Sequence, residues 1–586
     1  MDIFSIFTLC GGLGFFLFGM MVMSNGLEKL AGDKLDKFIK NATSNPIKSL
    51  ALGAGITVAI QSSSALTVML VGFVNSGIME LSQTIGMIMG SNIGTTLTSW
   101  ILSLSGIESS NFFIRLLKPE SFCPILSLLG VILVMSGKNN TSKRKNIGMF
   151  FVGFAILMFG MILMSSSMSP LAKNDEFAKI LTYFTNPVLG LLAGMIITAI
   201  IQSSAASVGI LQALAISGGV NWAIAVPIII GQNIGTCITS MISAIGVNTA
   251  AKRVAVIHVS FNILGALIFL PLYEIGHFFI NTIPFNQTIS PFGIAVVHSV
   301  FNIGTTRLLI PFAKVLEKIA YFVIKGDKDD EKVILDDRLL VVPSVAIEQS
   351  FRVTVEMGKL SKDILTMSVK MFKQYNPKFI EIINKKEKLI DKYQDELESF
   401  LQKLSAKDLT EAESNKISQL FLTISDIEKI ADYSIDILHI AQKTDSKNWT
   451  FMEDSISELK NVVNAVKDIY DYTMNSFINF DYNKALKIES FENIIDEMIN
   501  NAKKNHIRRI KNQKIHIRRS FYFVDILTNL ERISDHCSNI ASNIIHSQSN
   551  TIPKHELKNQ LKLKTNSSEV NSFREKYYIK SIKPEL

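Results

Sequence analysis

The sequence predicts an all-α protein in two parts: a polytopic membrane domain and, after it, a soluble helical bundle. Three observations lead to this prediction: an uneven distribution of charge, a series of apolar runs and an internal repeat. Residues 1–325 hold 19 of the 59 Lys and Arg residues and 11 of the 51 Asp and Glu residues. Residues 326–586 therefore hold 40 of each sign, and the net charge of +8 belongs to the apolar part. This contrast is typical of a membrane domain followed by a soluble one.

Apolar runs long enough to cross a bilayer recur through the first part. A hydrocarbon core of ~30 Å requires about 20 helical residues. The run at 122–136 is shorter, so we expect it to be tilted or partly re-entrant. The seven runs lie near 3–23, 84–104, 122–136, 147–168, 224–246, 254–275 and 289–313.

Two further apolar stretches, 46–80 and 187–222, do not fit a simple crossing. Each is too long for one helix across the membrane. Each is also too short for two helices and a turn, because about 15 residues per arm reach only ~22 Å at 1.5 Å per residue. We therefore predict two re-entrant helical hairpins, with polar residues at their tips.

The first part of the chain also repeats itself. Residues 12–99 align with residues 153–240 at a constant offset of 141, without a gap. The two copies are identical at 31 of 88 positions, and the identities include polar blocks that chance among apolar residues does not explain. One repeat holds three crossings and one hairpin, so the odd number of crossings inverts the second copy. Inverted repeats that meet near the bilayer midplane are the architecture of secondary transporters.

Lysine and arginine residues indicate the orientation. Three loops that face inward when the N-terminus is outside hold four, four and two basic residues: 24–47, 137–146 and 247–253. The three opposite loops hold two, two and none: 105–121, 169–186 and 276–288. The positive-inside rule then places the N-terminus outside the cytoplasmic (inner) membrane and the C-terminal part in the cytoplasm.

The two hairpin tips carry the same kind of polar residues. A helix that begins after a tip exposes N–H groups that attract an anion, and a helix that ends there exposes carbonyl groups that attract a cation. We therefore predict that both tips contribute to one ion-binding site. The alternative is that the serines only join helices or close a tight turn. The tip residues are Gln61, Ser62, Ser63, Ser64, Gln202, Ser203 and Ser204.

A second duplicated block follows each hairpin, reading GSNIGTT at 90–96 and GQNIGTC at 231–237. Amide and hydroxyl oxygens are suitable ligands for a hard cation. The two glycines also suit close helix packing, and the two interpretations are compatible. The predicted supporting residues are Asn92, Thr95, Thr96, Asn233 and Thr236.

The absence of acidic residues from the polar blocks indicates the coupling ion. They contain no Asp or Glu, whereas a proton-coupled carrier usually keeps a titratable carboxylate at membrane depth. We therefore expect sodium rather than protons. His258 and His298 each precede an Asn by four residues and are expected to be neutral packing groups, although a role in the site stays open. Arg307 either extends toward the inner surface or attracts the anion.

The second part of the chain is predicted to be a bundle of two three-helix units. Residues 326–345 begin with KGDKDDEK and are expected to form a linker, and residues 549–586 are expected to form a flexible tail. Between them, apolar residues follow a helical period. The two units resemble each other, since DIEKIADYSIDI at 426–437 matches NLERISDHCSNI at 529–540. The six helices are expected near 346–376, 380–404, 408–443, 450–478, 483–512 and 514–548.

With its paired QSS tips and GxNIGT blocks, the sequence resembles the type II sodium/phosphate cotransporter family over roughly residues 1–320. The resemblance implies symport of inorganic phosphate with sodium, with the tip residues as the substrate and sodium site. The chain departs from the family pattern at Ala205, where a third serine is expected, and at Cys237, which corresponds to Thr96 in the first repeat. These departures leave the number of sodium ions open.

The second part resembles PhoU, the phosphate-response regulator, over about residues 346–548. This resemblance implies a regulatory rather than a catalytic role. Some PhoU proteins bind metal through paired ExxxD motifs, so iron or zinc is one option here, and a solvated acidic edge is the other. The motif residues are Glu387, Asp391, Glu428, Asp432, Glu492, Asp496, Glu531 and Asp535.

Together these inferences predict a sodium-coupled phosphate symporter, with residues 1–325 as the transport domain and residues 346–548 as a PhoU-like module. Two alternatives stay open: a membrane phosphate receptor that signals without net flux, and a sodium-coupled carrier of another small oxyanion. We expect no enzyme, because the sequence lacks G-x-x-x-x-G-K-[ST], HExxH and GxSxG motifs. The expected partners are phosphate, sodium and membrane lipid, with no nucleic acid and no required cofactor. A homodimer or a cytoplasmic regulatory partner stays open.

Overall fold

The protein is described by a computed structural model. It covers residues 3–40, 45–107, 116, 118–137, 143–172, 175–279, 285–326, 335–407, 409–512, 517–548 and 568–579. Apart from one isolated bridge between Asn221 and Thr288, the regular structure of these residues is helical, which confirms the predicted all-α class. The chain divides into two compact units, Met1–Val345 and Ala346–Leu586.

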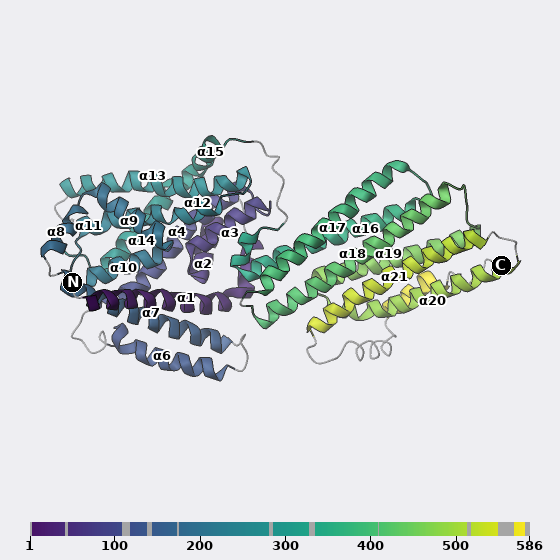
Figure 1. Ribbon diagram of the computed structural model, residues 1–586, viewed down its shortest axis with the longest axis horizontal. Helices are drawn as coiled ribbons and strands as arrows, with labels where there is room; N and C mark the ends of the chain where they lie inside the picture. The colour runs from purple at the N-terminus through teal and green to yellow at the C-terminus, as the bar shows by residue number, and fades with distance from the viewer. Residues whose placement is uncertain are drawn as a thin grey trace. The chain divides into compact units, whose positions relative to one another are not determined.

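The first unit contains helices α1 to α15 (Figure 1). In chain order they are α1 (Ile3–Lys40), α2 (Pro46–Ile60), α3 (Ser63–Asn75), α4 (Leu81–Ser103), α6 (Pro119–Ser136), α7 (Lys143–Ala172), α8 (Asp175–Tyr183), α9 (Pro187–Ile201), α10 (Ser204–Ile216), α11 (Trp222–Gly235), α12 (Cys237–Ser243), α13 (Thr249–Phe279), α14 (Pro291–Leu309) and α15 (Ala313–Val323). Short 3₁₀ turns follow α4 at Leu104–Gly106 and α14 at Ile310–Phe312.

Six helical segments of the described chain are long and apolar enough to cross a membrane. They correspond to six of the seven predicted runs. The remaining run, near 84–104, is the continuous helix α4, which does not reach the same apolarity. The six segments are Phe4–Leu30, Pro119–Ser136, Lys143–Met168, Trp222–Ser243, Thr249–Gly276 and Pro291–Val323.

Both predicted hairpins are pairs of short helices separated by a single break. The helix α2 begins at Pro46 behind the N-cap Asn45, ends at Ile60 with Gln61 as its C-cap, and is followed by α3. The helix α9 begins in the same way at Pro187 behind Asn186, ends at Ile201 with Gln202 as its C-cap, and is followed by α10. Proline suits the first helical position because that residue's N–H has no partner within a helix. The same Asn-Pro signal therefore marks the start of both hairpins.

Glycines of the duplicated blocks bring each hairpin against the next long helix. A Cβ atom at Gly90 would lie 2.0 Å from the carbonyl oxygen of Leu50, and one at Gly231 would lie 2.0 Å from that of Leu191. Gly53 and Gly194 make similar approaches from the hairpin side. Only a residue without a side chain permits such backbone contact. The packing role that the sequence left open for these glycines is therefore present.

Helices α1 and α7 pack along their length, and α6 lies against the other side of α7 (Figure 1). Glycines again set the distance, because Cβ atoms at Gly19 and Gly153 would overlap the backbones of Leu157 and Met23. Buried Phe16 and several methionines of α7 fill the core between the helices.

Among its described residues, the second unit contains six long helices, which match the six predicted ones in number and order. Observed boundaries differ from the predicted ones by a few residues, as is usual where helix ends fray. The helices are α16 (Pro343–Lys370), which starts at the end of the first unit, α17 (Pro377–Ser405), α18 (Glu411–Asp445), α19 (Glu453–Asn479), α20 (Tyr482–Asn512) and α21 (Ile517–Gln548).

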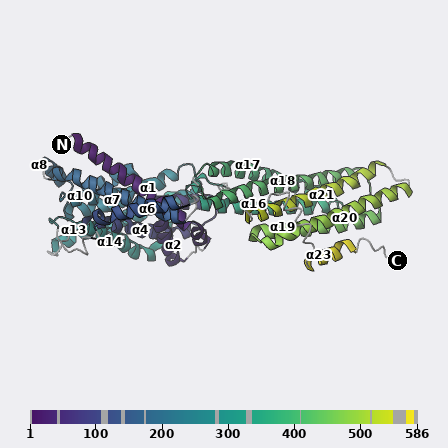
Figure 2. The ribbon, with the colours of Figure 1, turned by 90° about the horizontal axis from the view of Figure 1, so that it is seen from below.

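Two segments predicted to lack structure are ordered where the structure describes them. Within the predicted linker, Asp337–Val341 form a 3₁₀ helix, η3, that packs against α3. Within the predicted flexible tail, Ser568–Phe573 and Arg574–Ile579 form α23 and a π-helical turn, η4, beside α19 and α20 (Figure 2). Phe573 stacks on Phe491. The remaining residues of both segments, 327–334, 549–567 and 580–586, lie outside the described residues.

Candidate functional site

The tips of the two hairpins have the same backbone conformation. Gln61 and Gln202 close α2 and α9 in the left-handed region, at φ 56° and φ 58°. Non-glycine residues seldom adopt this region, and such strain is kept where the surrounding structure requires it. The next serine, Ser62 or Ser203, is extended and caps the following helix by accepting from the N–H three residues later. The two tips are therefore structural copies of each other.

Each tip leaves hydrogen-bond donors without a partner. Among the described residues, no acceptor pairs with the backbone N–H groups of Ser63 and Ser64, or with those of Ser204 and Ala205. The hydroxyls of Ser63 and Ser204 also make no hydrogen bond within the described chain, although both side chains are buried. Free N–H groups at a helix N-terminus, with hydroxyls beside them, can bind an oxyanion.

The glutamine side chains distinguish the two tips. Gln61 donates from Nε2 to the Val58 carbonyl oxygen at 2.8 Å, and its Oε1 accepts from the Thr98 hydroxyl at 3.0 Å. Gln202 is exposed in the isolated chain, and Thr239, which corresponds to Thr98, has a buried hydroxyl without a partner. The first tip is therefore held by α4, whereas the second tip lacks the equivalent bond.

The predicted supporting residues are all buried. Asn92 donates to Asn262 Oδ1 at 3.0 Å, whereas Asn233 donates to the Ile229 carbonyl oxygen of its own helix at 2.9 Å. The hydroxyls of Thr95, Thr96 and Thr236 each donate to a backbone carbonyl one turn earlier. Such hydroxyls still offer an oxygen lone pair to a cation.

The backbone stays helical through both duplicated blocks. Helix α4 runs through the whole of residues 90–96. Helices α11 and α12 are separated by the single residue Thr236, whose backbone is helical at φ −60° and ψ −26° and whose N–H donates to the Gln232 carbonyl oxygen at 3.1 Å. Close packing through the glycines is therefore the feature that the two blocks share.

Helix α4 connects the two hairpins through consecutive residues. Thr98 bonds to the first tip, and Ser99 accepts from Gln212 of α10 through its carbonyl and hydroxyl oxygens, at 3.1 and 3.3 Å. Gln212 also donates to the Pro291 carbonyl oxygen at 3.1 Å. No hydrogen bond between described atoms joins one tip directly to the other.

Four residues of this network were not predicted from the sequence: Thr98, Ser99, Gln212 and Asn262. Thr98 and Ser99 could have been found, because they are identical to Thr239 and Ser240 at the repeat offset. Gln212 is a single amide within an apolar helix, and Asn262 lies in the HVSFN segment. Asn262 is fully buried and donates to Cys237 Sγ at 3.3 Å while accepting from Asn92, so it connects the two duplicated blocks.

The histidines and Arg307 lie outside the hairpin tips. His258 contacts the Ser240 hydroxyl at 3.0 Å through Nδ1, and Asn302 donates to the His298 carbonyl oxygen at 2.8 Å. Both histidines are buried, in agreement with a packing role. Arg307 is exposed on α14, in agreement with a side chain that extends toward a membrane surface.

The acidic motifs of the second unit have different surroundings in the two triplets. In the first triplet, the Lys429 ammonium lies 3.1 Å from Glu428 and 3.0 Å from Asp432. The pKa values of Glu387 and Asp391 are raised by partial burial and then by neighbouring carboxylates. Among the described residues, these four carboxylates form no group compact enough to hold a metal.

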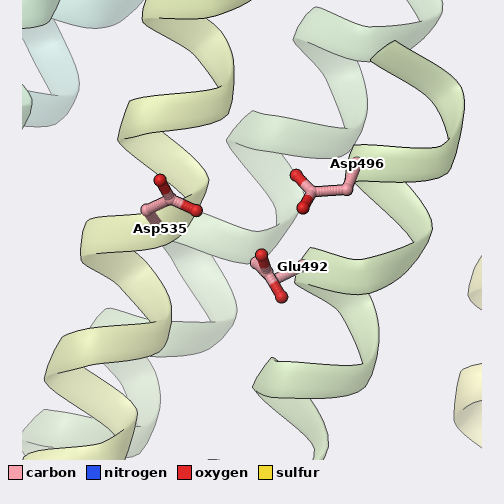
Figure 3. A group of neighbouring side chains, drawn as sticks. All are labelled: Glu492, Asp496 and Asp535. Carbon is pink, nitrogen blue, oxygen red and sulfur yellow. The ribbon is translucent and has the colours of Figure 1, made fainter. Parts of the chain in front are cut away.

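In the second triplet, three of the four carboxylates converge (Figure 3). Oxygens of Glu492 and Asp496 on α20 and of Asp535 on α21 lie within 4.8 Å of one another. The fourth, Glu531, is instead paired with Lys503 at 2.7 Å. Burial, and then the neighbouring carboxylates, raise the pKa of Glu492, and burial likewise raises that of Asp496. The Oδ1 atom of Asp496 is buried without a hydrogen-bond partner, so the trio fits a cation with oxygen ligands.

Comparison with protein families agrees with the two-unit architecture. The family described as Na+/Pi-cotransporter matches residues 15–166 and 156–281, two overlapping segments that follow the repeat. The PhoU domain family matches residues 354–441 and 459–544, one segment for each helical triplet.

Three curated relatives cover different parts of the chain. The "Uncharacterized protein YqeW" of Bacillus subtilis is 30% identical over 313 residues, which are 53% of this chain and 95% of the relative. The "Putative inorganic phosphate export protein YjbB" of Salmonella typhimurium is 20% identical over 551 residues, 92% of this chain and 97% of the relative. The "Sodium-dependent phosphate transport protein 2A" of Rattus norvegicus is 36% identical over 130 residues, 22% of this chain and 20% of the relative. The chain thus belongs to the Na+/Pi-cotransporter family of membrane transporters, is not an enzyme, and carries C-terminal PhoU domains.

Proposed function

We propose that this chain carries inorganic phosphate together with sodium across the cytoplasmic membrane, and that the two hairpin tips form the binding site. The observation that carries the proposal is the duplicated set of free donors at the starts of α3 and α10. A buried phosphate requires such donors and also a counter-charge, since an isolated anion is costly in a low-dielectric site. Bound sodium supplies that charge.

The buried amides of Asn92 and Asn233 and the buried hydroxyl of Thr236 support a sodium site close to the tips. Neutral side-chain oxygens are suitable ligands for a hard cation. If each ion stabilises the binding of the other, the coupling is reciprocal and the loaded site is the form that reorients.

The proposal includes the inverted repeat and the orientation predicted from the sequence, with the N-terminus outside. Asn75 at the end of α3, Asn248 at the start of α13 and the segment around Asp336 are all expected on the inner side. These three segments make hydrogen bonds with one another, which supports a common side for them.

The direction of transport follows from the gradients rather than from the site. The rat relative is named for sodium-dependent phosphate transport, and YjbB is named for phosphate export. A coupled carrier runs inward when sodium is higher outside and outward when phosphate and sodium are higher inside. Both names are therefore compatible with one sodium-coupled cycle.

The test is the flux of radiolabelled phosphate in vesicles that contain the purified full-length chain, with sodium and voltage varied independently. We expect phosphate to accumulate only with an inward sodium gradient, and preloaded phosphate to leave faster when sodium is also inside. A phosphate flux that does not depend on sodium would contradict the proposed coupling. Phosphate binding without net flux would instead favour a receptor, and flux of another small oxyanion in place of phosphate would change the substrate.

A second proposal concerns the PhoU-like unit. The trio of Glu492, Asp496 and Asp535 has the donor atoms to bind a divalent or trivalent cation, with iron, zinc or a harder ion as candidates. The full-length protein, stripped of metal and titrated with Mn²⁺, Fe²⁺ or Zn²⁺, should bind one of them. A variant with Glu492→Gln and Asp535→Asn should lose that binding, and equal binding by the variant would contradict the assignment.

A further inference from the structure

Residues 335–342, here named the strap, attach to the inner-facing ends predicted for both repeats. Asp336 is 2% exposed, and its Oδ2 accepts from Asn75 Nδ2, at the end of α3, at 2.6 Å. Asn75 in turn accepts from the Asn248 N–H at 3.0 Å, and its carbonyl oxygen accepts from Asn248 Nδ2 at the same distance. The buried carboxylate therefore holds the end of the first hairpin and, through Asn75, the start of α13.

Arg338 makes the second attachment. Its guanidinium pairs with Asp336 at 3.1 Å and donates to the carbonyl oxygens of Ser243 and Ile245, at 2.7 and 2.9 Å. Ser243 is the last residue of α12, where carbonyl groups lack partners within the helix. A cation at this position is favoured by the helix dipole and by charge-assisted hydrogen bonds.

Apolar contacts complete the strap. Leu339 is fully buried, and a Cβ atom at Gly72 of α3 would lie 3.1 Å from its Cδ2 atom. The strap therefore contacts α3 of the first repeat through Asp336 and Leu339, and α12 of the second repeat through Arg338. At Pro343 it continues into α16, the first helix that leads to the second unit.

We propose that the strap is a lock for the transport cycle, through which the PhoU-like unit controls transport. Alternating access in inverted-repeat carriers is largely a rocking of one repeat against the other. Opening on the side of Asn75 and Asn248 requires the ends of α3 and α12 to separate. The strap opposes this separation. A movement of α16 that displaces the strap would allow the two helix ends to separate. This inference rests on the proposed transport function, but its first test does not depend on flux.

The first test measures how fast a water-soluble thiol reagent labels Cys237, which is 2% exposed at the start of α12. The full-length chain carries Cys10→Ser, Cys123→Ser and Cys537→Ser, so Cys237 is the only thiol, and nanodiscs keep both faces open to the reagent. Arg338→Ala should raise the labelling rate about ten-fold, because charge-assisted hydrogen bonds are lost. Asp336→Asn should also raise it. Equal rates in the parent and in both folded variants would overturn the proposal.

Arg352→Ala is the matched control, since Arg352 pairs with Glu348 on the surface of α16 itself. It should leave the labelling rate unchanged. Thermal unfolding of each variant separates release of the strap from general loss of structure. An equal increase with Arg352→Ala would also count against the strap.

The second test locks the strap with a disulfide. A Cβ atom at Gly72 lies 3.4 Å from Cβ of Arg338, close to the ~3.5–4.5 Å that disulfides show. Phosphate flux by the Gly72→Cys/Arg338→Cys variant should rise several-fold when the oxidised protein is reduced. Equal flux in the two states would contradict the lock. If the parent chain shows no flux at all, the proposed transport function fails, and the Cys237 labelling decides on the strap by itself.

Discussion

The two hairpins share their backbone and differ in their side-chain partners. Both tips place a glutamine in the left-handed region and cap the next helix with a serine. Thr98 bonds to Gln61, whereas the equivalent Thr239 has no partner. Thr57 donates to Ser91 of α4, whereas Thr198 donates to Ser207 of its own hairpin. The duplicated backbone thus supplies the binding geometry twice, and the unequal attachments make the first tip the more fixed of the two.

The two triplets of the second unit differ in the same way. Matching helices carry matching acidic motifs, but in the first set Lys429 pairs with Glu428 and Asp432, while in the second set three carboxylates lie within 4.8 Å of one another. In both units a duplicated fold has become asymmetric through single side chains. Substitutions at matching positions test how far the two copies of each pair are equivalent.

The largest expected effect comes from the glycines that make the two hairpins equivalent in packing. Gly90→Val and Gly231→Val should each prevent stable folding, because even a Cβ atom would lie 2.0 Å from a carbonyl oxygen of the packed hairpin. Overpacking typically costs ~1–3 kcal/mol and more when backbones must move apart. The measurement is the yield of monodisperse protein and its thermal unfolding.

Gly55→Ala in α2 is the control, because nothing lies within 4 Å of a Cβ atom there. Alanine should be neutral or should stabilise the helix by about 0.5–1 kcal/mol. Normal folding of both valine variants would show that neither hairpin depends on the close contact. Failure of only one would show that the repeats pack differently.

The next effect tests whether both tips bind the substrate. Ser63→Ala and Ser204→Ala should each lower the apparent affinity for phosphate by about ten-fold or more, since a hydrogen bond to a charged group contributes ~1.5–3 kcal/mol. Concentration dependence of phosphate flux in vesicles measures this. Unequal losses of phosphate affinity would show which of the two tips contributes more to binding.

Ser166→Ala on α7 is the control, because that exposed hydroxyl only donates to its own helix at Leu163. It should leave flux unchanged. Normal affinity in both tip variants would remove these serines from the site.

A smaller effect is expected for the acidic trio. The raised pKa values of Glu492 and Asp496 mean that the folded unit binds protons at these two carboxylates more tightly than the unfolded chain does. Stability without metal is therefore highest at low pH and falls as pH rises from about 4, where the carboxyls of the unfolded chain ionise, toward about 8 for Glu492. At pH 8, Glu492→Gln should stabilise the metal-free protein by on the order of 1–2 kcal/mol.

Glu387→Gln in the first triplet is the matched variant, and it should change stability less, because Glu387 is more exposed. Denaturant unfolding of the second unit at pH 5 and pH 8 measures both variants. A stability that rises between these pH values, or equal effects of the two variants, would contradict the asymmetry.

The smallest effect concerns the unequal attachment of the glutamines. Thr98→Val should destabilise the protein by about 1 kcal/mol, because Gln61 loses its hydrogen bond from Thr98. Thr239→Val should be neutral or slightly stabilising, because its hydroxyl is buried without a partner. Thermal unfolding of the two variants side by side provides the test. Equal losses would mean that Thr239 has a partner in another state of the transport cycle.

The sequence by itself determined the helices, the duplications and the family. Apolar runs, helical periodicity, Asn-Pro starting signals and polar tips are local patterns, and a gapless repeat shows that two segments adopt the same local structure. The hairpin breaks at Gln61 and Gln202 and the six helices of the second unit were therefore predictable.

Only the tertiary structure decided which polar groups meet. Hydrogen bonds join Asn92 to Asn262, Gln212 to Ser99, and Asn75 to Asp336, across separations of 170, 113 and 261 residues. Such long-range contacts leave no periodic pattern in the sequence, because helix packing rather than the neighbouring residues decides which side chains meet. The same reason explains why a segment predicted to be a linker holds an ion pair with a buried carboxylate, that of Asp336. The polarity of a segment does not show whether its residues have partners in the folded protein.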